Sequence, residues 1–90
     1  MDKKEALALL EGVVDQLRTL PRSQLIGLKQ QRRVSGNSGV VYTIEIESWW
    51  DDRHKQNLRV TACIDEGGFR AFVPLCQAFI VAPDGSFVGD

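Results

Sequence analysis

The sequence predicts an α+β fold, in which an N-terminal amphipathic helix packs on one face of an antiparallel four- to five-stranded β-meander. Apolar residues first recur at steps of three and four and then, from residue 40 onward, at steps of two. Short turns rich in glycine and proline separate the segments, which favours sequential strands as neighbours. The 90 residues are 43% hydrophobic and 26% charged, which indicates one globular domain spanning residues 1–90.

The first expected element is a helix that begins near Asp2 and ends before Pro21. Asp2 and Glu5 have the spacing of a capping box, and proline forces the residue before it out of the helical conformation. The apolar stripe of this helix comprises Leu7, Leu10, Val13, Val14, Leu17 and Leu20. A short turn capped by Ser23 follows, and it is expected to bury Leu25, Ile26 and Leu28.

Three segments then have the two-residue period of β-strands. Residues 29–35 are polar and basic, which suits a sheet edge, where charges discourage aggregation. Residues 40–50 and 58–65 are rich in β-branched and aromatic side chains. We expect the helix to cover the face formed by Tyr42, Ile44, Ile46, Val60, Ala62, Ile64, Phe69 and Ala71.

The last third of the chain is expected to complete the sheet. A turn at residues 66–68 leads into a third long strand over residues 69–73, which Pro74 ends because proline cannot donate to a strand ladder. Residues 78–82 form a short strand. The turn at residues 83–85 then lets the chain fold back as a small C-terminal hairpin.

Four segments of the second half carry a resemblance to other proteins. They are WDDR at residues 50–53, NLRV at residues 57–60, DEGGFRAF at residues 65–72 and APDGSFVG at residues 82–89. In these segments the chain resembles a group of small, uncharacterised bacterial proteins of about this length. The resemblance covers about half the chain and implies a similar fold, but it implies no activity, cofactor or catalytic residue.

Charge and targeting signals exclude several classes of partner. Eleven basic and twelve acidic residues give a net charge of −1, which supplies no general attraction to nucleic acid or to an anionic membrane. The N-terminus lacks the uninterrupted apolar run of a secretory signal, so we expect a cytoplasmic protein without membrane contact. The two cysteines, Cys63 and Cys76, are then expected to be reduced packing residues.

Few residues could carry chemistry. The single histidine, His54, lies far from Cys63 in the predicted topology, so no nucleophile has a base in reach and we expect neither an enzyme nor a cofactor. Asp51, Asp52 and His54 form one cluster, in the loop of residues 51–57. This loop and Asp65 could bind a hard cation or a small ligand. Aspartates in turns more commonly bond their own backbone, which is the interpretation we favour.

Single-stranded nucleic-acid binding is a further alternative. Lys29, Arg32 and Arg33 cluster on the expected edge strand, and Trp49 could stack on a base. The slightly acidic composition of the chain opposes this hypothesis, because nucleic-acid binding domains are typically basic. The favoured interpretation of the basic residues is an edge that blocks aggregation.

The sheet face away from the helix carries the leading hypothesis. Matching the strands across the hairpins places Glu47 near Arg59 or Thr61, Glu45 near Thr61 or Cys63, Arg70 beside Cys63 and Phe72 beside Thr61. Opposite charges on this face could form a surface network. Tryptophan and arginine are enriched at binding hot spots, although Trp49 could also pack over the sheet edge or under the C-terminal tail.

We therefore expect a non-enzymatic protein-interaction module, most simply a homodimer, that uses this face or an edge strand. The expected interaction face comprises Trp49, Phe72, Arg59, Arg70, Glu45 and Glu47.

Overall fold

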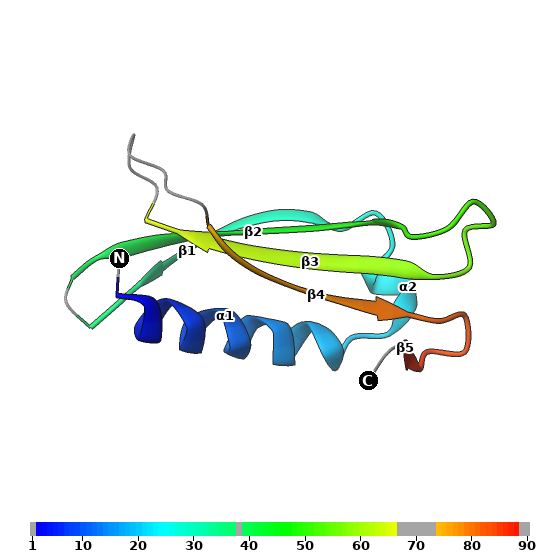
Figure 1. Ribbon diagram of the computed structural model, residues 1–90, viewed down its shortest axis with the longest axis horizontal. Coiled ribbons are helices and arrows are strands. Elements are labelled where there is room, and N and C mark those ends of the chain that lie inside the picture. The colour runs from blue at the N-terminus through cyan, green and yellow to red at the C-terminus, as the bar shows by residue number, and fades with distance from the viewer. Residues whose placement is uncertain (1, 38, 67–73, 89–90) are drawn as a thin grey trace.

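The computed structural model describes residues 2–37, 39–66 and 74–88, which form two helices and one five-stranded sheet (Figure 1). The elements are α1 (Lys3–Arg18), α2 (Arg22–Leu25), β1 (Lys29–Ser35), β2 (Val41–Trp50), β3 (Leu58–Asp65), β4 (Leu75–Val81) and β5 (Phe87–Val88). The strands lie in the order β1-β2-β3-β4-β5, and every neighbouring pair is antiparallel. This architecture is the predicted α+β fold with a β-meander and a C-terminal hairpin.

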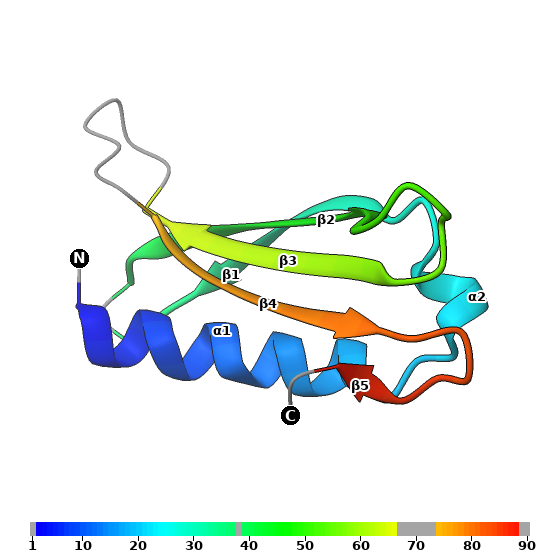
Figure 2. The ribbon, with the colours of Figure 1, turned by 45° about the vertical axis from the view of Figure 1, so that its right-hand side comes forward.

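Helix α1 runs along a single face of the sheet, where it packs against β3 and β4 (Figures 1 and 2). Its buried side chains are Ala6, Leu10, Val13, Val14 and Leu17. The predicted stripe was wrong at Leu7 and Leu20, which are 40% and 36% exposed. Ala6 lines up with Leu10 at a four-residue step, which moves Leu7 to the margin of the stripe, and Leu20 lies beyond the helix end. None of the described helices is long and apolar enough to cross a membrane.

The two long central strands confirm the predicted alternation. Tyr42, Ile44 and Ile46 of β2 are fully buried beneath α1, whereas Val41 and Trp49 on the opposite side of the same strand are exposed. Leu58, Val60, Ala62 and Ile64 of β3 are buried in the same layer. One face of the sheet therefore supplies most of the core, as expected for a sheet covered by one helix.

The strand that follows β3 differs from the prediction. Residues 67–73 lie outside the described residues. They include the whole strand expected over residues 69–73, with Phe69, Arg70, Ala71 and Phe72. The partner of β3 is β4. This strand begins at Leu75, three residues before the start of the short strand predicted over residues 78–82. Cys63 lies opposite Cys76 and Thr61 opposite Ala78, so β4 occupies the positions beside β3 that the predicted register gave to Arg70 and Phe72. The turn predicted at the two glycines after Glu66 also lies outside the described residues, and the described ladder between β3 and β4 includes the pair Ile64 and Leu75.

Side-chain contacts join both helices to the sheet. The guanidinium of Arg18 lies over the rings of Phe79 and Phe87, at 5.3 and 4.9 Å from their centroids, and it joins the C-terminal hairpin to α1. The hydroxyl of Ser48 donates to the carbonyl of Leu25 and accepts from the backbone N–H of Leu28, which ties α2 to β2.

The short turn after α1 differs in detail from its prediction. Helix α2 begins at Arg22 after Pro21, so Ser23 lies inside the helix and does not cap it. Of the three apolar residues expected to be buried there, Leu25 is buried and Leu28 is half-buried, but Ile26 is 42% exposed.

Candidate functional site: the uncovered sheet face

The candidate site is the side of the sheet opposite α1, termed the uncovered face. Directly paired residues of antiparallel strands point to the same side of a sheet, so the register defines this face row by row. One row comprises Trp49, Arg59, Ile80 and Val88. The next rows comprise Lys29, Glu47, Thr61 and Ala78, then Gln31, Glu45, Cys63 and Cys76, and then Arg33, Thr43 and Asp65.

One end of the uncovered face is apolar. Trp49 is 46% exposed and Val88 is 44% exposed, and the half-buried Ile80 belongs to the same row. Trp49 was predicted to lie on this face, but Ile80 and Val88 were not, because the predicted topology placed another strand beside β3. The period of two in residues 75–81 was the signal that could have found them.

An open depression of about 150 Å³ lies in the middle of this face. It is lined by Glu45, Glu47, Trp49, Thr61 and Cys63. Pockets that enclose small organic ligands typically measure about 300–1,000 Å³, so this depression is too small for such a ligand. It can accept one side chain of a partner.

The charges of the face are arranged across neighbouring strands. Lys29 lies directly opposite Glu47, and the predicted proximity of Glu47 to Thr61 and of Glu45 to Cys63 is confirmed. The predicted network between these glutamates and Arg59 was wrong, since the Nε of Arg59 donates to Oδ1 of Asp51 at 2.8 Å. Within the part of the chain that the structure describes, both glutamates are without an ion pair.

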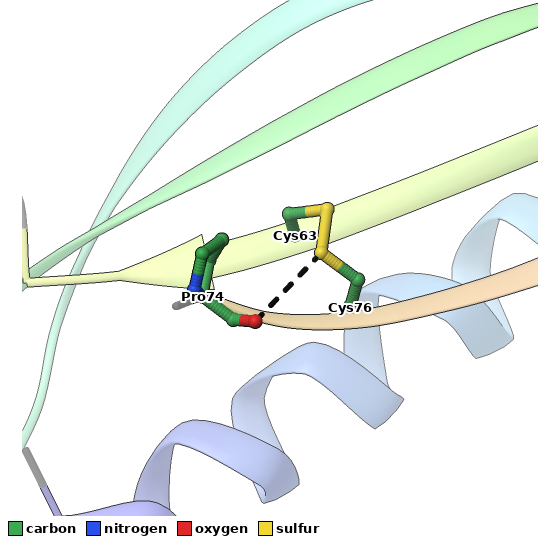
Figure 3. Close-up of a disulfide and its surroundings, with 3 residues drawn as sticks. All are labelled: Cys63, Pro74 and Cys76. Carbon is green, nitrogen blue, oxygen red and sulfur yellow. Dashed lines mark hydrogen bonds between the residues drawn. A yellow bond between two sulfur atoms is a disulfide. The ribbon is translucent and has the colours of Figure 1, made fainter. Parts of the chain in front are cut away.

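The two cysteines form a disulfide between β3 and β4, so the prediction of reduced packing residues was wrong (Figure 3). Cys63 and Cys76 are directly opposite in the register, with their Cα atoms 4.1 Å apart. Cys76 is exposed, and its sulfur lies 3.9 Å from the carbonyl oxygen of Pro74. The disulfide therefore lies on the uncovered face, next to the depression.

The loop of residues 51–57 shows turn chemistry. Oδ1 of Asp52 accepts hydrogen bonds from the backbone N–H groups of Gln56 and Asn57 at 2.9 and 3.2 Å. The bond from Gln56 is the main reason that the pKa of the Asp52 carboxyl lies below its usual range. Asp51 is paired with Arg59, as described above.

These contacts leave the candidate metal ligands dispersed. His54 is exposed, and Asp65 lies at the far end of β3 from the loop. Among the described residues, no three histidine, cysteine, aspartate or glutamate side chains gather as a metal-binding group.

The basic residues of β1 are divided between the two faces. Lys29 and Arg33 belong to rows of the uncovered face, whereas Arg32 lies opposite the buried Ile44. The guanidinium of Arg32 donates to the side-chain oxygens of Gln30 and, in α1, Gln16. A single basic groove beside Trp49 is therefore not formed by these three residues.

Comparisons of the chain with protein-family models, with curated proteins and with solved structures gave no match. The resemblance to a group of small bacterial proteins stays a prediction.

Proposed function

We propose that this chain is a non-enzymatic protein-interaction module that forms a homodimer through its uncovered face. The observation that carries the proposal is the half-exposed Trp49 beside an open depression of about 150 Å³, on the side of the sheet that α1 does not cover. An exposed tryptophan and a pocket that accepts a side chain are recurrent features of binding hot spots.

The size of the face supports a pair of moderate affinity. Five strands about 4.8 Å apart, with about 3.3 Å per residue along the eight-residue β3, give a face of roughly 20 by 26 Å. Two such faces would together bury roughly 1,000 Å², which is near the lower limit for specific interfaces.

The charges of the face favour self-association. Basic Lys29 and Arg33 lie at one margin, and acidic Glu45 and Glu47 lie one strand further in. A two-fold symmetric pair presents the same patch from both copies, so a patch that carries both signs can complement itself. The apolar end around Trp49 supplies surface that gains from leaving water.

The disulfide bears on the cellular location. The cytoplasmic location expected from the sequence stays a prediction. Disulfides persist in oxidising compartments and are rare in the cytosol of mesophiles. The bond between Cys63 and Cys76 therefore favours an oxidising compartment, or a cytosolic chain whose thiols are oxidised transiently.

Size-exclusion chromatography with light scattering, over a concentration series, tests the proposed dimer. We expect the wild-type chain to be a dimer at the upper concentrations and Trp49→Ala to shift the equilibrium to monomer. Leu7→Ala is the matched control, because Leu7 is an apolar residue of similar exposure on the outside of α1. This variant should remain dimeric.

Two outcomes would refute the proposal. A wild-type chain that stays monomeric at every concentration would exclude the homodimer. A dimer that Trp49→Ala and Glu47→Lys both leave unchanged would place the contact on another surface.

A further inference from the structure

Strand β1 forms one edge of the sheet, and no described strand pairs with its outer side. The hydrogen bonds at its two ends reveal which backbone groups point outward. The N–H of Gly36 donates to the carbonyl of Val40 at 2.7 Å, and the N–H of Ser48 donates to the carbonyl of Leu28 at 3.0 Å. Bonded and non-bonded pairs alternate along an antiparallel ladder, so the even-numbered residues of β1 bond to β2.

The odd-numbered residues Lys29, Gln31, Arg33 and Ser35 therefore direct their N–H and C=O groups to the free edge. Their side chains belong to the uncovered face, and all four are exposed. The edge thus combines a row of free backbone donors and acceptors with two cationic side chains, four residues apart.

A second copy of β1 fits this edge poorly. Antiparallel pairing of β1 with a second copy of itself about its centre would place Arg32 opposite the Arg32 of that copy. Arg33 of each copy would lie beside this pair. Like charges directly opposite one another destabilise strand pairing. The charge of the edge thus discourages self-pairing, and it selects a strand of opposite charge.

We propose that the free edge of β1 binds an extended acidic segment of another protein, which adds to the sheet as a sixth strand. Main-chain hydrogen bonds to Lys29, Gln31 and Arg33 supply the general affinity, as in other cases of strand addition. Carboxylates placed opposite Lys29 and Arg33 supply the specificity. The recognised segment therefore has acidic residues four positions apart, with β-branched residues between them. This site uses the backbone edge of β1, but it shares the side chains of Lys29 and Arg33 with the proposed dimer contact on the face.

Fluorescence anisotropy with labelled peptides tests this proposal. The probe is the heptapeptide TEVTVET, whose glutamates at its second and sixth positions would lie opposite Arg33 and Lys29. The comparison peptide, TKVTVKT, has lysine at those two positions. We expect the acidic peptide to bind wild-type protein at least tenfold more tightly than the basic one, with an affinity that falls as salt rises.

Gln31→Pro tests the backbone component of binding. The N–H of Gln31 points outward, so proline there removes a donor of the free edge without removing a bond to β2. We expect at least a tenfold loss of affinity, while the matched variant Gln31→Ala, which keeps the N–H, stays within twofold of wild type. Circular dichroism melts establish that both variants are folded. If Gln31→Pro is unfolded, the acidic peptide carrying N-methyl groups on its edge-facing amides takes its place.

Charge reversal tests the specificity. Lys29→Glu with Arg33→Glu should exchange the preference, so that the basic peptide binds more tightly, whereas Lys3→Glu with Lys4→Glu on α1 should leave it unchanged. The proposal is overturned if neither peptide binds at millimolar concentration, or if Gln31→Pro and its peptide substitute bind normally. It is also overturned if oligothymidylate displaces the acidic peptide and Gln31→Pro leaves the affinity for the oligonucleotide unchanged. The edge would then bind through its charges alone, without backbone hydrogen bonds.

Discussion

The carboxylate of Glu5 accepts a hydrogen bond from the hydroxyl of Tyr42 at 3.0 Å, which joins the first turn of α1 to the start of β2. The same carboxylate accepts the backbone N–H of Asn37 at 3.0 Å. Asp2 caps α1 as predicted, through the N–H of Glu5 at 3.1 Å. The capping box was only half right, because the Glu5 carboxylate bonds to the sheet and its hairpin loop instead of returning to Asp2.

Tyr42 should couple stability to alkaline pH. Burial, together with the nearby Glu5 carboxylate, raises the pKa of the Tyr42 hydroxyl from 10 to about 12. The folded chain therefore keeps a proton that the unfolded chain loses above pH 10, so the stabilisation is complete below pH 10 and is lost as pH rises through 12. Because Tyr42 is the single tyrosine, absorbance of tyrosinate at 295 nm reports its titration directly.

The control for this titration is Tyr42→Phe, whose stability should lack the decline between pH 10 and 12. Glu5→Gln should lower the titration midpoint of Tyr42 and the melting temperature together. A wild-type midpoint near 10 under folding conditions would contradict the buried position of the hydroxyl.

Two glycine substitutions should have opposite effects. A β-carbon at Gly36 would collide with the Glu5 carboxylate and would lie 2.8 Å from the Tyr42 ring, closer than side-chain atoms normally approach. We expect Gly36→Ala to lower the free energy of unfolding by about 1–3 kcal/mol, as overpacking typically does. Gly12→Ala in α1 meets no atom within 4 Å, and it should stabilise the chain by about 1 kcal/mol through helix propensity. Urea denaturation measures both, and equal effects would contradict the tight approach at Gly36.

Leu10 and Leu7 provide a matched test of helix orientation. Both are leucines of α1, but Leu10 is fully buried and Leu7 is 40% exposed. Leu10→Ala should cost about 2–5 kcal/mol of unfolding free energy, because it leaves a cavity under the helix. Leu7→Ala should cost much less, about 1 kcal/mol or below. Similar losses for the two variants, measured by urea denaturation, would mean that α1 packs with a different face.

Reduction should destabilise the chain substantially. The disulfide joins residues 13 positions apart, and closing a loop of about this length stabilises a fold by about 3 kcal/mol in the chain-entropy model. Thermal melts with and without dithiothreitol should differ accordingly, and the double variant Cys63→Ser/Cys76→Ser should be insensitive to the reductant. Titration of thiols in denaturant should find none in the untreated protein. Two free thiols there would contradict the disulfide.

Residue alternation within single strands was sufficient to predict much of the fold. The two-residue spacing of apolar side chains such as Ile44, Ile46 and Val60 indicates the covered face. The short loop between β2 and β3 fixes the pairing of Glu47 with Thr61. These features depend on local pattern and on one hairpin, so a sequence can express them directly.

The connection between β3 and β4 was not predictable in the same way. The pairing of Ile64 with Leu75 depends on which part of the later chain meets β3, and no local pattern fixes this choice. The two adjacent glycines after Glu66 predicted a strand directly after them as the partner. The error propagated to Cys63 and Cys76, whose juxtaposition exists only in the actual register. The free edge of β1 was predicted as an edge, but the direction of its backbone groups required the hydrogen bonds at Leu28 and Gly36.

The position of the disulfide has a thermodynamic consequence for any molecule that covers the uncovered face. Cys63 and Cys76 occupy the same cross-strand row as Glu45 and Gln31, so a partner lying on that row that binds the disulfide form more tightly than the dithiol form would stabilise the disulfide. Coupling of this kind is reciprocal. If a bound partner lowers the equilibrium constant for reduction of the disulfide by some factor, reduction lowers the affinity for the partner by the same factor. The redox potential of the compartment would then control binding of the partner, and binding of the partner would control the redox state of the disulfide.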